Sequence, residues 1–283
     1  MNVLSLFDGM SCGQIALERV GIKINNYYAS EIKKHAIEVT QHNYPKTIQL
    51  GDVKKIKTKD LPKIDLLIGG SPCQDFSRAN KERKGIKGEK SSLFFEYVRL
   101  LKECKPKYFL LENVIMSEYN YWFICNELNC EPVRICGSLV SGALRDRLYW
   151  TNIPPFSYDI TGRLISNIFP PKDKKITLQS ILDSGYSKKR KHNCLTLNCC
   201  SVRNIDSMIH REKTTGMTTL IFEEKSFDYS KGIRYVNKSE LERLHNIPEG
   251  YTDILTFNQA NDVIGDGWTV DVVAHIFKNL KTN

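Results

Sequence analysis

The stretch "LLIGGSPC" (residues 66–73) decides the fold. A short apolar run ends in two glycines, and a proline then precedes a cysteine. Such a run, bounded by glycine, is typical of a strand buried on both faces of a parallel sheet. Ligands of these sheets bind at the carboxyl ends of the strands. Cys73 is therefore expected at the end of the sheet where α/β proteins have their functional residues.

Strands and helices alternate on both sides of this stretch. Apolar runs predict strands over residues 1–9, 25–31, 63–70 and 107–114. Helical spacing of apolar residues predicts helices over 13–21, 32–45 and 92–106. This alternation predicts an α/β fold with a doubly wound, mostly parallel sheet.

The pattern changes after about residue 150. Residues 155–232 are rich in polar residues and carry only short strand-like pieces, such as 174–182. Helical periodicity returns at 237–248, where Asn237 or Ser239 would cap the helix. We therefore expect a first domain over 1–154, a small second domain over 155–232 and a return to the first domain over 233–283.

Composition excludes several classes of protein. Hydrophobic residues make up 41% of the 283 and charged residues 26%, as in ordinary globular proteins. An apolar run of about 18 residues, which a membrane span needs, is missing, and the start lacks a secretory signal, so we expect a cytoplasmic protein without membrane contact. The nine cysteines have no metal-binding spacing and are expected to be free thiols, with no metal site.

The net charge of +9 favours a polyanionic partner. Basic residues gather at 81–90 and 188–191, both in expected loops. A lysine-rich solvated surface would explain the same charge without a partner.

The first strand ends in "FDGMSCGQ" (residues 7–14), with glycines at 9 and 13. Glycines there let a ligand approach the backbone at a helix N-terminus. Glu31 ends the second strand about 20 residues later, where a carboxylate accepts hydrogen bonds from ribose hydroxyls. Together they favour an adenosine-containing cofactor, although a tight turn explains the glycines equally well.

Cys73 is the candidate nucleophile, because a basic loop follows it. The histidines lie outside the strand ends, which disfavours a cysteine–histidine hydrolase. Glu112, at a neighbouring strand end, could hold or deliver a proton to a ring nitrogen, or be a solvated acid. Arg145 and Arg147 lie on one side of an extended segment and suit a phosphate or ring carbonyl, or salt bridges to nearby acids.

Six stretches, in this order, resemble the motifs of the cytosine-C5 DNA methyltransferase family. They are "LSLFDGMSCGQIALERVG", "GGSPCQDFS", "LLENV", "LRDRLYW", "RYVNKSELERLHNIPEGYT" and "GDGWTVDVVAHIF". The segment from residue 71 to 101 looks most like the de novo (Dnmt3-like) branch and its phage and bacterial relatives. The resemblance implies an S-adenosylmethionine-dependent, Rossmann-like fold in which residues 155–232 form the target-recognition domain.

The resemblance also implies a reaction. The enzyme would flip a cytosine out of double-stranded DNA and transfer a methyl group to its C5, through a covalent bond between cysteine and C6. The product of S-adenosyl-L-methionine would be S-adenosyl-L-homocysteine. Catalytic roles are implied for Pro72, Cys73, Glu112, Asn113, Arg145 and Arg147.

Two further sets of residues are implied by the same resemblance. Cofactor contacts are expected from Phe7, Asp8, Gly9, Gly13, Glu31, Ile32, Asp52, Val53, Trp268 and Val270. DNA contacts are expected from Ser77, Arg78, Ala79, Arg83, Lys84, Lys189, Arg190, Arg203 and Arg211. Restriction–modification is one expected setting, and the oligomeric state stays open.

Three alternatives remain at this point. One branch of the family methylates cytosine in tRNA, although its "CFT" tripeptide is missing here. A second alternative is a catalytically silent, DNA-binding accessory member. A third is a nucleotide-dependent oxidoreductase with the same kind of sheet.

Overall fold

The computed structural model describes residues 1–71, 92–196, 200, 204–216 and 218–281. The chain divides into two compact units. Unit 1 comprises Met1–Ile135, Asp146–Pro170 and Val273–Asn283, and unit 2 comprises Cys136–Arg145 and Pro171–Val272. Unit 2 thus takes in residues 233–272, which were expected to return to the first domain. The functional division into catalytic and target-recognition domains stays a prediction.

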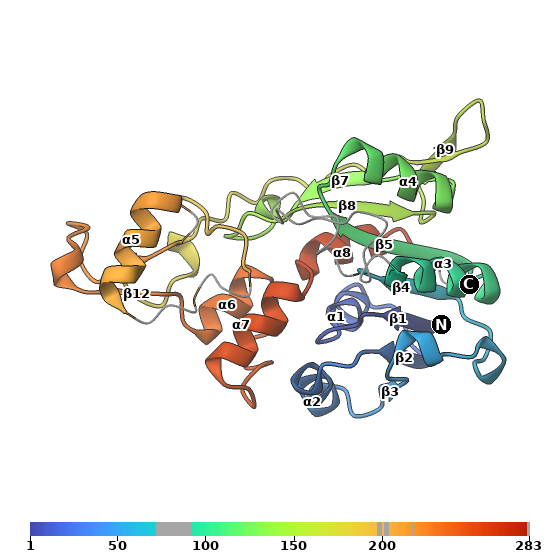
Figure 1. The fold of residues 1–283 in the computed structure, drawn as a ribbon, viewed down its shortest axis with the longest axis horizontal. Helices are drawn as coiled ribbons and strands as arrows, with labels where there is room; N and C mark the ends of the chain where they lie inside the picture. Colours follow the sequence, from blue (N-terminus) through green and yellow to red (C-terminus); the bar gives the residue numbers. More distant parts are fainter. Residues whose placement is uncertain (72–91, 197–199, 201–203, 217, 282–283) are drawn as a thin grey trace. The chain divides into compact units, whose positions relative to one another are not determined.

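A mostly parallel sheet forms the centre of unit 1. Its strand order is β3-β2-β1-β4-β5-β8-β7, which Figure 1 shows from bottom to top. Neighbours from β3 to β5 pair in parallel, and β8 pairs antiparallel to β5. The strands are β1 Asn2–Leu6, β2 Asn26–Ser30, β3 Ile48–Gln49, β4 Leu66–Gly69, β5 Tyr108–Val114, β7 Val133–Cys136 and β8 Asp146–Thr151.

Helices connect and flank these strands. They are α1 Cys12–Arg19, α2 Lys34–Asn43, α3 Ser92–Cys104 and α4 Glu118–Leu128, with short 3₁₀ helices η1 Val53–Lys55 and η2 Thr58–Asp60. A smaller sheet of β6 Cys130–Glu131, β9 Phe156–Tyr158 and β10 Leu164–Ser166 completes unit 1. The doubly wound, mostly parallel sheet expected from the sequence is confirmed.

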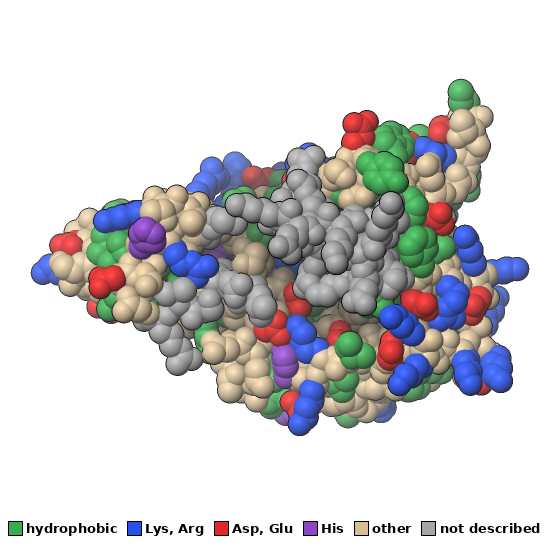
Figure 2. Space-filling model, in the orientation of Figure 1, with side chains coloured by type: hydrophobic (Ala, Val, Ile, Leu, Met, Phe, Trp, Pro, Cys, Tyr) green, Lys and Arg blue, Asp and Glu red, His purple; other side chains and the backbone are tan. Residues whose placement is uncertain are grey.

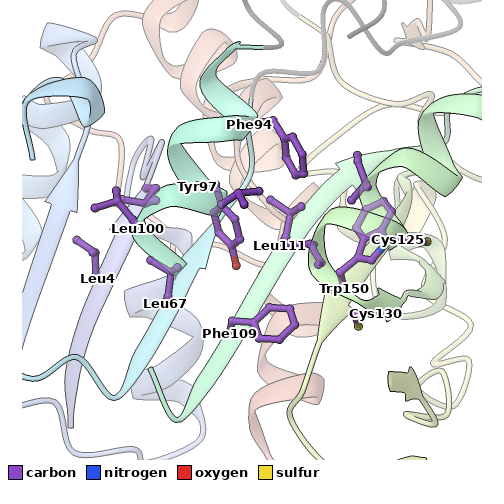
Figure 3. Packing of buried hydrophobic residues seen from close by; sticks show 14 of the residues in the cluster. Leu4, Leu67, Phe94, Tyr97, Leu100, Phe109, Leu111, Cys125, Cys130 and Trp150 are labelled. Carbon is purple, nitrogen blue, oxygen red and sulfur yellow. Dashed lines mark hydrogen bonds between the residues drawn. The ribbon is translucent and has the colours of Figure 1, made fainter. Parts of the chain in front are cut away.

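The core of unit 1 explains why these segments fold as they do. Apolar side chains of β1, β4, β5 and β8 interlock with those of α3 and α4, as Figure 3 shows for Leu67, Phe94, Leu111 and Trp150. All four residues of β4 are buried, as its continuous apolar run predicts.

Gly69 is the point where β4 needs a glycine. A Cβ there would lie 3.0 Å from the carbonyl oxygen of Leu6 and 3.1 Å from the Tyr97 ring. Strand β1 and helix α3 therefore pack against β4 at a distance that leaves no room for a side chain at position 69.

Unit 2 is built from short elements. They are α5 Ile205–Thr215, β11 Ile221–Phe222, β12 Ile233–Arg234, α6 Lys238–Leu244 and α7 Phe257–Asp266, with η4 Gly137–Leu139, η5 Gln179–Ile181 and η6 Tyr229–Lys231. Helix α8 (Val270–Phe277) follows α7. Asn237 caps α6, as expected, in a capping box with Glu240.

Two features of unit 2 differ from the sequence expectation. The strand-like run 174–182 forms the 3₁₀ helix η5 and no strand, because its backbone bonds go to separate segments: Lys174 N–H to Leu139 and Leu178 N–H to Arg190. Helices α5 and α7 were not expected. Within the described residues, none of the helices is long and apolar enough to cross a membrane.

Candidate active site

The turn after β1 has an unusual backbone. Phe7, Gly9 and Ser11 all have positive φ, at 56°, 59° and 62°. Among the described residues, a Cβ added to Gly9 would meet nothing within 4 Å. Non-glycine residues adopt this region rarely and at an energetic cost, which the surrounding contacts must offset.

The Asp8 carboxylate fixes that turn. It accepts hydrogen bonds from the Ser11 hydroxyl and, at 2.8 Å, from Tyr27 Oη on β2. Burial raises the pKa of Asp8 from 3.8 to about 6, against the lowering effect of these donors. Neither Ser11 nor Tyr27 was singled out from the sequence, because their role depends on the folded turn.

Glu31 joins the carboxyl ends of β1 and β2. Its carboxylate accepts backbone N–H bonds from Gly9, Ile32 and Lys33, each at 2.8 Å. The next side chain, Ile32, is 76% exposed. A fixed carboxylate beside an exposed apolar side chain offers a ribose acceptor and an apolar surface for a base. These residues therefore fit an adenosine-containing cofactor.

The other expected cofactor residues have different surroundings. Gly13 is buried in the first turn of α1. Asp52 caps η1 by accepting a bond from Lys54 N–H, while Val53 belongs to the hydrophobic core. Trp268 and Val270 are buried in unit 2.

Glu112 and Arg147 form an ion pair at the end of β5. Arg147 Nε lies 2.8 Å from Glu112 Oε1, and both side chains are nearly buried. The register explains the contact: Glu112 opposes Tyr149 and Val114 opposes Arg147, so the two side chains are diagonal neighbours on one face. The sequence anticipated both residues, and the antiparallel pairing brings them together.

Asn113, on β5, is hydrogen-bonded to Ser71, which lies two positions after the end of β4. Its Nδ2 donates to Ser71 O at 3.3 Å and Ser71 Oγ at 3.2 Å, while its Oδ1 accepts from Val114 N–H. All of these groups are buried or nearly so. Ser71 was not among the expected site residues, although it is the last described residue before Cys73.

Arg145 has a different setting from Arg147. It belongs to unit 2, where its guanidinium donates to the carbonyls of Gly265 at 3.0 Å and Asp266 at 3.5 Å, at the end of α7. Within the part of the chain that the structure describes, these carbonyls and the Cys194 thiol are its hydrogen-bond partners, and none of them is an acidic side chain. Its contacts point to a role in holding the last turn of α7.

The basic run 188–191 is largely engaged within unit 2. Lys189 Nζ donates to the carbonyls of Gly216 and Thr218, and burial lowers its pKa. Lys191 Nζ donates to carbonyls of Ser138 and Ser141. Arg190 is exposed and Arg211 half-buried. Of the expected DNA contacts in this run, Arg190 is thus the freely exposed one.

Several expected residues lie outside the described part of the chain. They are Pro72, Cys73, Ser77, Arg78, Ala79, Arg83, Lys84 and Arg203. Among the residues that are described, no group of His, Cys, Asp and Glu side chains could hold a metal ion.

Sequence comparisons find relatives of the first part of the chain. Residues 1–118 match the family of C-5 cytosine-specific DNA methylases. The orphan methyltransferase M.SPRI of Bacillus phage SPR is 45% identical over 116 residues, 40% of this chain and 26% of that protein. Type II methyltransferase M.NlaIV of Neisseria lactamica is 43% identical over 118 residues, 40% of this chain and 28% of that protein. The chain thus matches about a quarter of the length of these relatives.

Solved structures resemble the whole chain. The Entamoeba histolytica methyltransferase EhMeth has a TM-score of 0.72 at 19% identity, over 100% of this chain and 99% of that one. A mutant of Spodoptera frugiperda DNMT2 has a TM-score of 0.70 at 18% identity, over 98% of both chains. At such identities the likeness concerns the fold, and it confirms the Rossmann-like class.

Proposed function

We propose that this chain, whose residues 1–118 match the C-5 cytosine-specific DNA methylase family, transfers a methyl group to C5 of cytosine in double-stranded DNA. The observation that carries the proposal is the bond from Asn113 to Ser71. It ties the strand end that bears Glu112 to the residue two positions before Cys73. The last described residue before Cys73 thus lies beside the strand end of the acid, which supports the pairing of Cys73 with Glu112 in this proposal.

The reaction divides between these groups. The Cys73 thiolate attacks C6 of a cytosine and forms the sulfur–carbon bond, while the Glu112 carboxyl donates a proton to N3. Arg147, in contact with Glu112, holds that carboxyl against the ring. Electron density then accumulates at C5, which forms a bond to the methyl carbon. A water molecule takes the C5 proton, which expels the Cys73 thiolate, and N3 returns its proton to the Glu112 carboxylate, so the enzyme is restored.

The turn after β1, together with Glu31 at the end of β2, suits the methyl donor. When bound, S-adenosyl-L-methionine supplies an electrophilic methyl group and leaves as S-adenosyl-L-homocysteine. Three backbone donors occupy three of the about four lone-pair sites of the Glu31 carboxylate, and the remaining site, on Oε2, suits a ribose hydroxyl. Ile32 would contact the adenine, and Asp52, whose carboxylate is held by Lys54 N–H, would accept from its amino group.

A base inside a duplex cannot be reached by Cys73. The target must therefore leave the stack, which costs a few kcal/mol. Arg78 and Ala79, shortly after Cys73 in the sequence, are the proposed residues that fill the vacated place.

The direct test supplies the pure protein with labelled S-adenosyl-L-methionine and either duplex DNA or tRNA. We expect label in DNA, recovered as 5-methylcytosine. Label in tRNA alone would establish the RNA branch instead. Binding of DNA without any transfer would identify a silent accessory member, and failure to bind S-adenosyl-L-methionine would favour the oxidoreductase.

A further inference from the structure

The hairpin of β9 and β10 forms one edge of the smaller sheet of unit 1. The strand order of that sheet is β6-β10-β9, so among the described residues β9 has a neighbouring strand on one side only. All three residues of β9, Phe156, Ser157 and Tyr158, are exposed. Figure 1 shows the hairpin projecting from the rest of unit 1, and Figure 2 shows hydrophobic side chains at its tip. An edge strand of this kind offers unpaired backbone groups to another strand.

The register decides which backbone groups of β9 face the open edge. Two bonds flank the strand, from Asn167 N–H to Pro155 O and from Asp159 N–H to Arg163 O, each 2.9 Å long. In an antiparallel pair every second residue is bonded to the neighbouring strand, so the residues at 155, 157 and 159 face β10. The N–H and C=O groups of the two aromatic residues of β9 therefore point away from β10, toward the open edge.

The side chains of β9 carry no charge. The rings of Phe156 and Tyr158 meet edge to face, with centroids 5.7 Å apart. Tyr158 is 64% exposed and Phe156 37%. The acid that follows in the sequence, Asp159, is engaged by the turn itself, because its carboxylate accepts from Thr161 N–H, Thr161 Oγ1 and Arg163 N–H. This aromatic edge lacks the lysines that commonly keep edge strands apart.

We propose that β9 pairs antiparallel with β9 of a second copy of this chain, about a twofold axis at Ser157. Phe156 then lies opposite the partner's Tyr158, and the two residues exchange both of their N–H···O=C bonds. The strand is thus complementary to itself, which a closed, symmetric dimer requires. The small sheets of the two copies join into one continuous sheet. This dimer does not depend on the proposed function.

The sequence around β9 favours this register and this occupant. The register uses the outward groups of both aromatic residues, whereas a shift by one position sets them opposite residues that already face β10. Pro154 and Pro155, which lack an N–H, precede the strand, and the turn that begins at Asp159 follows it, so the pairing segment is short. Two copies of a chain with a net charge of +9 would meet where that chain is uncharged.

The size of this contact indicates a weak dimer. A buried aromatic side chain covers about 150–250 Å², so the exposed parts of the four rings would add roughly 400 Å² to the backbone contact. A stable interface of standard size covers about 1,200–2,000 Å². We therefore expect a dissociation constant on the order of 100 μM.

Sedimentation velocity of the full chain, without nucleic acid, tests the contact over about 5–500 μM, a range that brackets this constant. We expect a shift from monomer to dimer that persists at raised salt, because uncharged groups make the contact. Tyr158→Lys puts a charge on the edge and should abolish the shift. The matched control is Tyr119→Lys, which changes a 72% exposed aromatic residue of α4 and should leave the shift intact. Thermal unfolding verifies that each variant is folded.

A cysteine at the axis tests the register. Residues opposed in a non-hydrogen-bonded antiparallel pair have Cα atoms about 4.5 Å apart, which a disulfide can span. Ser157→Cys should therefore form a covalent dimer on mild oxidation, and mass spectrometry should map the bond to position 157. Ile160→Cys, fully exposed in the turn but away from the axis, should not form one.

Three results would overturn the proposal. They are a wild-type chain that stays monomeric throughout the concentration range, a dimer that responds alike to Tyr158→Lys and Tyr119→Lys, and a dimer in which Ser157→Cys crosslinks no better than Ile160→Cys. Methyl transfer, which Tyr158→Lys should leave unchanged, is measured separately, so these results are distinguishable from a failure of the proposed function.

Discussion

At the residue scale, the ion pair between Arg147 and Glu112 can be tested by a single substitution. Arg147→Gln leaves Glu112 without its cation and should lower kcat by about 100-fold or more, since positioned acids contribute that much. Single-turnover methylation of DNA would measure it. The control is Arg134→Gln, which removes the cation of a surface pair with Asp146 on the same sheet and should change kcat little. Equal loss in both variants would contradict the assigned role.

Asp8 gives a prediction about pH. The pKa of Asp8 is about 6 in the folded chain and 3.8 as a free side chain. Between pH 3.8 and pH 6, the Asp8 carboxyl is therefore mostly protonated in the folded state and mostly ionised in the unfolded state. Stability should therefore fall as pH rises from about 4 to about 6, by roughly 3 kcal/mol at most.

The variant Asp8→Asn removes this linkage. The difference in unfolding free energy between Asp8→Asn and wild type should favour the variant more at pH 7 than at pH 4, measured by urea unfolding. A difference that does not change with pH would show that Asp8 is not protonated in the fold near pH 5.

At the element scale, α6 depends on one buried acid. Glu240 accepts from both Nη atoms of Arg234, from Asn237 N–H and from Asp183 N–H. Glu240→Ala removes the buried acceptor of these donors, although Arg234 is partly exposed and also donates to the carbonyls of Ser184 and Tyr235, and should lower the unfolding free energy by about 3 kcal/mol.

Glu249→Ala is the control for that variant. Glu249 pairs with Arg243 of the same helix but is 62% exposed, so its loss should lower the unfolding free energy far less than the loss of Glu240. Denaturant unfolding compares the two, and similar losses would mean that burial does not decide the strength of these pairs.

The elements also show what could be predicted from the sequence. Strands β1, β2, β4 and β5 were predictable, because strands buried on both faces read as apolar runs. Helix α5 was missed, since burying little beyond Met208 leaves no apolar stripe to detect. Helix α7 was also missed, although its capping box of Thr256 and Gln259 was a usable signal.

The candidate site also has parts that could be predicted from the sequence and parts that could not. Glu112 and Arg147 were predictable from their strand-end positions, and the structure adds their contact. The three backbone bonds to Glu31 were not predictable, because they depend on positive φ at Gly9 and on the path of the chain after β2. Asn113 was among the residues implied by the family resemblance, and the structure adds its bonds to Ser71, two positions before Cys73 in the sequence.

At the scale of the whole molecule, the charge of +9 bears on DNA binding. Phosphate contacts release counterions, so the affinity for duplex DNA should fall steeply with salt. For three contacts the expected loss between 50 and 200 mM salt is about 40-fold. Fluorescence anisotropy at four salt concentrations would measure the slope. A flat response would contradict a phosphate-binding surface.

The central claim is that Cys73 bonds to a cytosine that the chain methylates. The most direct measurement uses duplex DNA that carries 5-fluorocytosine, whose fluorine replaces the C5 proton and so blocks release of the cysteine. With S-adenosyl-L-methionine present, the account predicts a protein–DNA adduct that survives denaturation and maps to Cys73 by mass spectrometry, and its loss in Cys73→Ser. An adduct of equal yield in Cys73→Ser, or none in wild-type protein that binds the same DNA, would contradict the account.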